Sequence, residues 1–156
     1  MQQGGAELLQ ALEHAARARN VELSTHKIAK PQEIPAAIES AKAAGAEGLN
    51  VMASPILIGN HKIIIEHVAA LRLPAIYQAP DEAEAGGFVA YGPRFVQIFR
   101  DLVAPQLIKL LRGVKPANIP IEQPTKFELV INLKTANALN ITVPQNLLAN
   151  ADNLIE

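Results

Sequence analysis

The sequence predicts an α/β fold built on a parallel sheet, and three observations support this. Short apolar runs alternate with alanine-rich amphipathic segments over residues 1–92. The run Gly48–Ala53 is apolar on both faces except at Asn50, which is typical of a central parallel strand. After Gly86–Pro93 the pattern changes to a long apolar helix, a proline-rich loop, one strand and a helical tail. We therefore expect an α/β lobe over 1–92, without its first strand, and an extension over 93–156.

Composition limits the possible functions. The 156 residues, 49% of them hydrophobic, suffice for one domain with its own core. The net charge of −1 provides no basic field for nucleic acid, so we expect no nucleic-acid partner. The absence of cysteine excludes disulfides, thiolate catalysis and cysteine-bound metal. No apolar run is long enough to span a membrane, and Met1–Gly5 shows no signal peptide.

The first part of the chain contains alternating helix and strand candidates. The expected helices are 6–19, a helix that Pro31 or Pro35 opens and Gly45 ends, and 59–71. The expected strands are 21–29, 48–53, 74–78 and 88–91, with a loop at 79–87. A strand normally precedes a helix such as 6–19 in a βαβ unit, so the pattern starts within a unit.

The second part begins with a helix over Pro93–Arg112, which has a broad apolar face. Pro105 lies inside this helix and should kink it or split it in two. We expect an extended loop at 115–124, a strand at 126–133 and a short helix at 135–139. Asn140 can take the left-handed conformation that ends such a helix, and Pro144 opens the last helix.

The carboxyl ends of the expected strands are the candidate binding site, because open parallel sheets bind ligands there. They carry Ser54–Pro55, Tyr77–Gln78 and Tyr91–Gly92, which offer hydroxyls, an amide and two aromatic faces but no activated nucleophile. Ser54 could equally cap the next helix, and Tyr77 could belong to the core. These residues favour a binding protein over an enzyme.

Other polar groups give weaker signals. His61 and His67 are six residues apart, whereas a helical zinc motif needs a spacing of four, so we expect no metal and no cofactor. The acidic loop Asp81, Glu82 and Glu84 fits a solvated loop better than a catalytic site. Gly86–Gly87 precedes a strand and is better explained as a turn than as a phosphate loop.

The tail carries a more specific signal. Residues 124–136 (Pro-Thr-Lys-Phe-Glu-Leu-Val-Ile-Asn-Leu-Lys-Thr-Ala), with Ala138–Leu139, Pro144, Leu147–Leu148 and Ala151–Asp152, resemble the C-terminal end of a family of ABC-transporter substrate-binding proteins. This family includes the tryptophan- and tyrosine-type binders. Similar middle motifs are 73–77, 84–87, 91–93 and the helix exit 111–116.

The resemblance implies one lobe of a type I periplasmic-binding fold, with a C-terminal helix–strand–helix extension. It implies a small-molecule ligand, such as an amino acid, held without catalysis and delivered to an ABC permease, and a periplasmic or membrane-anchored location. The expected ligand-binding residues are Ser54, Pro55, Tyr77, Gln78, Glu84, Gly87 and Tyr91. The apolar face of helix 93–112 would pack on a lobe that this chain lacks, so we expect a homo-oligomer through this helix.

The chain departs from the family pattern at three positions. Ser54 stands where many members have an acidic residue, Asn140 replaces a glycine, and Pro105 interrupts a continuous helix. Ser54 removes a carboxylate that would pair with a ligand's ammonium group. Two alternatives stay open: an α/β enzyme that uses the acidic loop or His61, and a dimerising interaction or regulatory domain.

Overall fold

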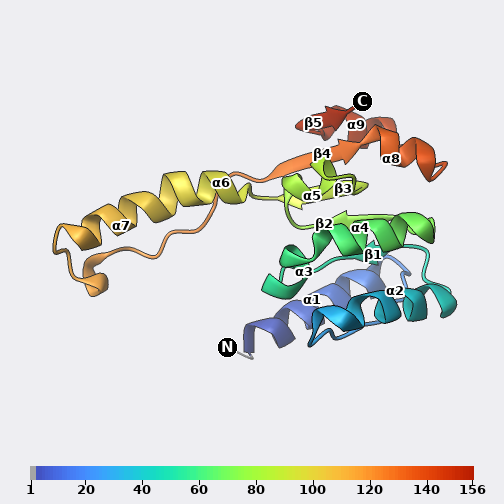
Figure 1. Cartoon of the computed structure of the whole chain (residues 1–156), viewed down its shortest axis with the longest axis horizontal. Helices are drawn as coiled ribbons and strands as arrows, with labels where there is room; N and C mark the ends of the chain where they lie inside the picture. Colours follow the sequence, from blue (N-terminus) through green and yellow to red (C-terminus); the bar gives the residue numbers. More distant parts are fainter. Residues whose placement is uncertain (1–2) are drawn as a thin grey trace.

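A computed structural model describes residues 3–156 and contains a five-stranded sheet in the order β1-β2-β3-β4-β5 (Figure 1). The strands are β1 (Leu49–Asn50), β2 (Ala75–Tyr77), β3 (Val89–Gly92), β4 (Glu128–Asn132) and β5 (Asn153–Ile155). All neighbouring pairs are parallel except β3 and β4. The predicted α/β class with a mainly parallel sheet is confirmed.

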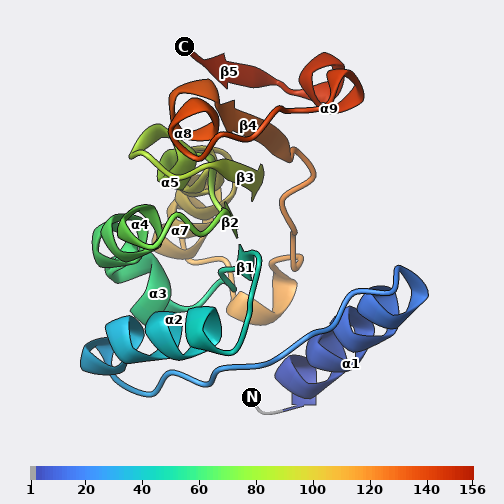
Figure 2. The same cartoon turned by 90° about the vertical axis from the view of Figure 1, so that its right-hand side faces the viewer.

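Helices cover one face of this sheet. They are α2 (Ile34–Ala43), α4 (His61–Ala70), α5 (Pro80–Glu84) and α8 (Leu133–Ala138), and they lie to the left of the strands in Figure 2. The other face, on the right in that view, is the open face, which these four helices do not cover. Helix α9 (Gln145–Asn150) and the chain returning to β4 lie on that side near β4 and β5. Helix α1 (Gln3–Ala18) lies on the open side, apart from the sheet.

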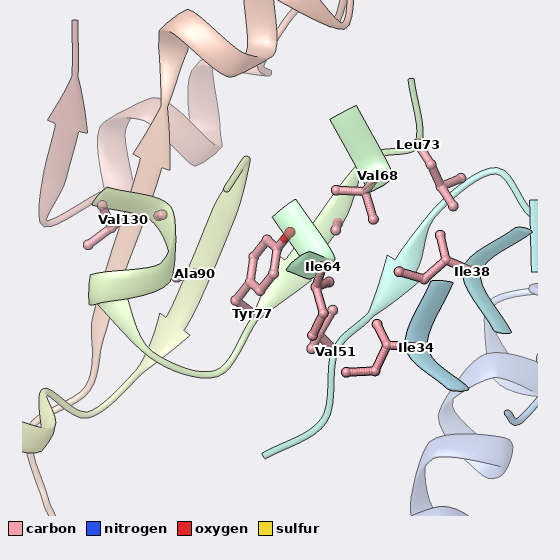
Figure 3. Packing of buried hydrophobic residues seen from close by; sticks show 11 residues of the cluster. Ile34, Ile38, Val51, Ile64, Val68, Leu73, Tyr77, Ala90 and Val130 are labelled. Atoms are coloured by element: carbon pink, nitrogen blue, oxygen red, sulfur yellow. The ribbon is translucent and has the colours of Figure 1, made fainter. Parts of the chain in front are cut away.

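The core lies between the sheet and the covering helices. The helices contribute aliphatic side chains from positions three or four apart, such as Ile34 and Ile38 of α2 and Ile64 and Val68 of α4 (Figure 3). The strands contribute Ala75, Tyr77, Ala90 and Val130. At the end of α2, Gly45 has a φ of 93°, so the predicted glycine stop is confirmed.

The predicted strand 21–29 is wrong. Residues 21–28 have no regular structure, and Val21 and Leu23 are 56% and 41% exposed. None of the five strands of the described chain pairs with this segment. A strand's backbone groups need hydrogen-bonding neighbours, so the alternating pattern alone does not produce a strand here.

The long helix of the second part is one continuous rod with an irregular middle. It consists of α6 (Phe95–Ile98), a π-helical turn (Phe99–Val103) and α7 (Ala104–Leu111). Pro105 has no N–H to bond to the preceding turn, which accounts for the π turn just before it. Figure 1 shows this rod leaving the body of the molecule, with the chain returning beside it through the 3-10 turn Pro116–Asn118. We call α6, the π turn and α7 the arm.

The remaining differences concern short elements. The expected loop 79–87 is wrong in part, because it contains α5, whose Glu82 side chain accepts a hydrogen bond from Ala79 N. Strand β5 was not expected, and it follows α9 (Gln145–Asn150). A separate turn, α3 (Pro55–Gly59), precedes α4. Asn140 has a φ of 58°, as predicted for a left-handed stop. Among residues 3–156, no helix combines the length and the apolar character that crossing a membrane requires.

Candidate functional site

The carboxyl ends of β1, β2 and β3 bring polar side chains together on the open face. Asn50 pairs with Ile76 in the sheet, so both point to this face, and Gln78 follows two residues after Ile76 on the same side. The Gln78 amide donates a hydrogen bond of 3.2 Å to Asn50 Oδ1. Tyr91 of β3 also points to this face, because it lies two residues beyond Val89, the partner of Ile76.

An aromatic pair borders this polar row. Tyr91 is 53% exposed and Phe127 is 47% exposed, and their ring centroids lie 5.8 Å apart. Aromatic side chains that remain half exposed on an open sheet face offer a large apolar contact surface. Asn50, Gln78, Tyr91 and Phe127 together form what we call the edge surface.

Gly92 makes the edge surface possible, because it lets β3 approach β2 closely. A Cβ at this position would lie 1.9 Å from the carbonyl oxygen of Gln78 and 2.9 Å from its carbonyl carbon. Both contacts are with backbone atoms, which cannot rotate away. Only glycine therefore fits beside Gln78 without moving the strands.

Arg94 fixes the position where the chain leaves the sheet. Its Nε donates to Glu128 of β4 at 2.6 Å, and its terminal nitrogen donates to Glu84 of α5 at 2.7 Å. Lys126 Nζ lies 3.3 Å from the same Glu128, and the hydrogen bonds from Arg94 hold the pKa of Glu128 below its ordinary value. Glu84, expected as a ligand contact, thus has an ion-pair partner at the base of the arm.

The two other strand-end candidates, Ser54 and Pro55, belong to the start of α3. Ser54 is the N-cap of α3, and its Oγ accepts a hydrogen bond from Leu57 N at 3.2 Å. Pro55 is the first residue of that helix and is exposed. Ser54 therefore caps α3, as one of the two interpretations of this residue predicted. Its hydroxyl hydrogen can still be donated to another acceptor.

Tyr77 and Gly87 lie in the core. Tyr77 is fully buried, its hydroxyl has no hydrogen-bond partner among the described residues, and burial raises its pKa well above the ordinary value. Gly87 packs against it, since a Cβ there would lie 2.6 Å from the Tyr77 ring. The structure gives both residues a packing role.

The candidate catalytic groups make local structural contacts. His61 Nδ1 lies 2.9 Å from the carbonyl oxygen of Ile58 in the preceding turn. Glu82 is buried against the backbone of Ala79, and desolvation raises its pKa. Within residues 3–156, no group of three or more potential ligands is arranged to hold a metal ion.

Two hollows of the described chain lie away from the edge surface. One, of about 100 Å³, lies between α4 and α8 and is lined by Ile65, Leu73, Phe88 and Leu139 among others. It is near the start of β2, at the opposite end of the strand from Gln78. The other, of about 330 Å³, lies on the arm between Leu110 and the returning chain. No residue of the edge surface lines either of these two hollows.

Comparison with known proteins identifies the family. The family model described as "ABC transporter substrate binding protein" matches residues 3–155. The chain belongs to this family. No curated protein gave a match.

Solved structures share the fold of this family member. A conserved domain protein from Vibrio cholerae O1 biovar El Tor superposes with a TM-score of 0.86 at 21% identity, over 96% of this chain. The ABC domain in complex with L-Trp from Streptococcus pneumoniae superposes with a TM-score of 0.84 at 18% identity, over 97% of this chain. The ligand-free, open structure of a substrate-binding protein with adhesive properties from Clostridium difficile superposes with a TM-score of 0.63 at 17% identity, also over 97% of this chain. This chain spans 50% of the length of each of these three structures.

Sequence reasoning missed several site residues of this family member. In the sequence, Asn50 was notable only as the one polar residue of an apolar strand. A ligand-binding role would have explained this polar residue. Phe127 and Arg94 gave no signal in the sequence, because their partners Tyr91, Glu84 and Glu128 are distant in the chain. The pairing of β3 with β4 and the position of α5 beside Arg94 reveal these contacts.

Proposed function

We propose that this chain is a solute-binding lobe of an ABC importer's substrate-binding protein, with the type I periplasmic-binding fold. The observation that carries the proposal is the edge surface. It combines two side-chain amides with two aromatic rings, and it lies where parallel sheets bind ligands. The family membership and the fold likeness support the same role.

The proposed ligand is an amino acid or a similar small amphiphile. The amides of Asn50 and Gln78 can donate to a carboxylate and accept from an ammonium group. The rings of Tyr91 and Phe127 would contact an apolar side chain, and the Ser54 hydroxyl would donate a further hydrogen bond. One structural neighbour is in complex with L-Trp, which has these three parts.

Binding by this lobe breaks no bond. The edge surface covers one side of the ligand, and a second lobe closing over it would exclude water and strengthen the hydrogen bonds. This explains why the ligand contacts need no enclosed pocket in the lobe. We further propose that the receptor serves an ABC permease, as its family name suggests, and that it is periplasmic or membrane-anchored, as is normal for this family.

Isothermal titration calorimetry with a panel of L-amino acids tests the proposal. A single lobe should bind its best ligand with a Kd of about 1 mM, because half of the contacts are absent. Tyr91→Ala should weaken this binding at least fivefold through loss of the aromatic face. Gln123→Ala, a control in the exposed returning chain, should leave it unchanged. Equal binding by both variants, or no heat with any amino acid, would refute the proposed site.

A further inference from the structure

We propose that Glu82 is a positioning residue for the solute contact. Its carboxylate fixes the peptide group between Gln78 and Ala79, and thereby aims the Gln78 side chain along the edge surface. The inference rests on the proposed function, because Gln78 is one of the two amides that this function assigns to the ligand. Glu82 itself belongs to α5, on the covered face of the sheet, and is 5% exposed. It therefore acts through Gln78 and does not touch the solute.

The peptide group between Gln78 and Ala79 is held on both sides. Its N–H, which belongs to Ala79, donates a buried hydrogen bond of 3.0 Å to Glu82 Oε2. Its carbonyl oxygen, which belongs to Gln78, lies against Gly92 of β3, where an added Cβ would be only 1.9 Å away. Because a peptide group is planar, contacts at its oxygen and at its N–H together restrict its rotation. The backbone from which the Gln78 side chain departs is fixed in consequence.

Sheet pairing alone does not fix this peptide group. Strand β2 ends at Tyr77, so Gln78 and Ala79 lie beyond its paired residues. The direction of a side chain depends on the backbone dihedral angles of its own residue. The Gln78 amide reaches across to Asn50 of β1, to which it donates at 3.2 Å, and this reach requires one backbone conformation. Glu82 supplies the constraint that the strand ladder does not.

Glu82 sits on a firm support. Asn132 of β4, itself 5% exposed, donates a hydrogen bond of 3.0 Å to the carbonyl oxygen of Ala83. Thr135 Oγ1 of α8 donates to the carbonyl oxygen of Gly86 at 2.9 Å. These two bonds tie α5 and the turn after it to β4 and α8. A group that orients another must itself be held in this way.

The burial of Glu82 is unfavourable for stability. None of the ion pairs of the described chain includes Glu82, and a buried carboxylate without a cationic partner is destabilising. Desolvation accordingly raises its pKa. A capping glutamate does not need burial, because Glu33 accepts from Ala29 N and Lys30 N at 2.8 and 3.2 Å in an exposed position. An unfavourable buried group beside a ligand contact is typical of functional sites.

Two substitutions of Glu82 test the positioning. Glu82→Leu fills the buried volume without an acceptor, whereas Glu82→Gln keeps an acceptor oxygen for the Ala79 N–H. Both remove the charge, so the hydrogen bond is what distinguishes them. Nuclear magnetic resonance spectra of the ¹⁵N-labelled chain without ligand report the side-chain amides of Gln78 and Asn50. Glu82→Leu should shift both amide signals, and Glu82→Gln should leave them near their wild-type positions.

Glu33→Leu is the matched control, because it removes the exposed capping glutamate and should shift neither amide signal. Wild-type signals of Gln78 and Asn50 in folded Glu82→Leu would overturn the proposal. Circular dichroism shows whether that variant is folded. If it is not, hydrogen exchange of the wild-type chain decides: the Ala79 N–H should exchange at least about 100-fold more slowly than in an unstructured peptide. Exchange at the unstructured rate would overturn the positioning.

Titration with the L-amino acid that the wild type binds best tests the consequence for binding. Glu82→Leu should weaken binding about threefold, because the hydrogen bond from Gln78 to the solute is lost. In a Gln78→Ala chain the same substitution should have no further effect, since the side chain that it positions is gone. A loss of equal size in that background would overturn action through Gln78. If the wild type binds no amino acid, the proposed function fails, and the ligand-free spectra still decide whether Glu82 positions Gln78.

Discussion

Gly92→Ala is expected to destabilise the protein strongly, because the added methyl group has no space between β2 and β3. The new Cβ would lie 1.9 Å from the carbonyl oxygen of Gln78, whereas contacts under 3.0 Å are essentially never observed. The strands must therefore separate by about 1 Å at their carboxyl ends, which stretches the ladder hydrogen bonds there. Overpacking of this kind costs about 2–3 kcal/mol.

Urea denaturation followed by circular dichroism measures this loss. With an m-value of about 2 kcal/mol/M, the midpoint should fall by about 1–1.5 M. Gly59→Ala is the control, since a Cβ at Gly59 in α3 meets nothing within 4 Å and its φ is not positive. The free energy of unfolding of that variant should be unchanged or higher by up to about 0.5 kcal/mol. A urea midpoint of the Gly92→Ala protein within about 0.5 M of the wild-type midpoint would refute the close approach of β2 and β3.

Substitutions at three further positions test other parts of the structure. Arg94 lowers the pKa of Glu128, so the ion pair stabilises above pH 4.5 and is lost as pH falls through the lowered pKa. Glu128→Gln should therefore lower the free energy of unfolding by about 1–2 kcal/mol at pH 7 but by little near pH 3. Urea titrations at both pH values measure this difference. Tyr77→Phe should leave the stability unchanged or raise it by up to about 1 kcal/mol, because it removes a buried hydroxyl that has no hydrogen-bond partner among the described residues. A lower melting temperature of this variant would contradict the prediction. Asn140→Ala should lower the melting temperature through about 1 kcal/mol of left-handed strain, while Asn140→Gly should not.

The sequence predicted the elements whose signals are local. Helical periodicity located α2 and α4, the glycine at 45 and Asn140 marked helix ends, and apolar runs located β2 and β3. Pro105 was expected to kink the long helix or split it in two, and the irregularity that the structure shows is a π turn at Phe99–Val103 within a continuous rod. These features depend on residues within one or two turns of each other.

Errors arose where distant contacts decide the structure. Segment 21–29 has the composition of a strand, yet no described strand accompanies it. Strand β5 is three residues long and forms only because β4 provides a neighbour, with Asp152 accepting a hydrogen bond from Leu129 N at 2.8 Å. Neither outcome could be derived from the segment itself. The division into 1–92 and 93–156 stays a prediction.

The candidate site was predictable in position but only partly in composition. The carboxyl ends of the strands led to Gln78 and Tyr91, which lie on the edge surface. Tyr77 follows the same rule, but one residue of difference turns its side chain to the covered face and into the core. Only the observed register distinguishes these two orientations.

Nuclear magnetic resonance tests the solute-binding claim most directly. Spectra of the ¹⁵N-labelled chain would be recorded during titration with L-amino acids, including L-tryptophan, up to about 10 mM, which detects millimolar affinity. The account predicts shifts of the side-chain amides of Asn50 and Gln78 and of the backbone around Tyr91, saturating with one ligand class. Unchanged spectra throughout the panel, or shifts confined to the hollow between α4 and α8, would contradict it.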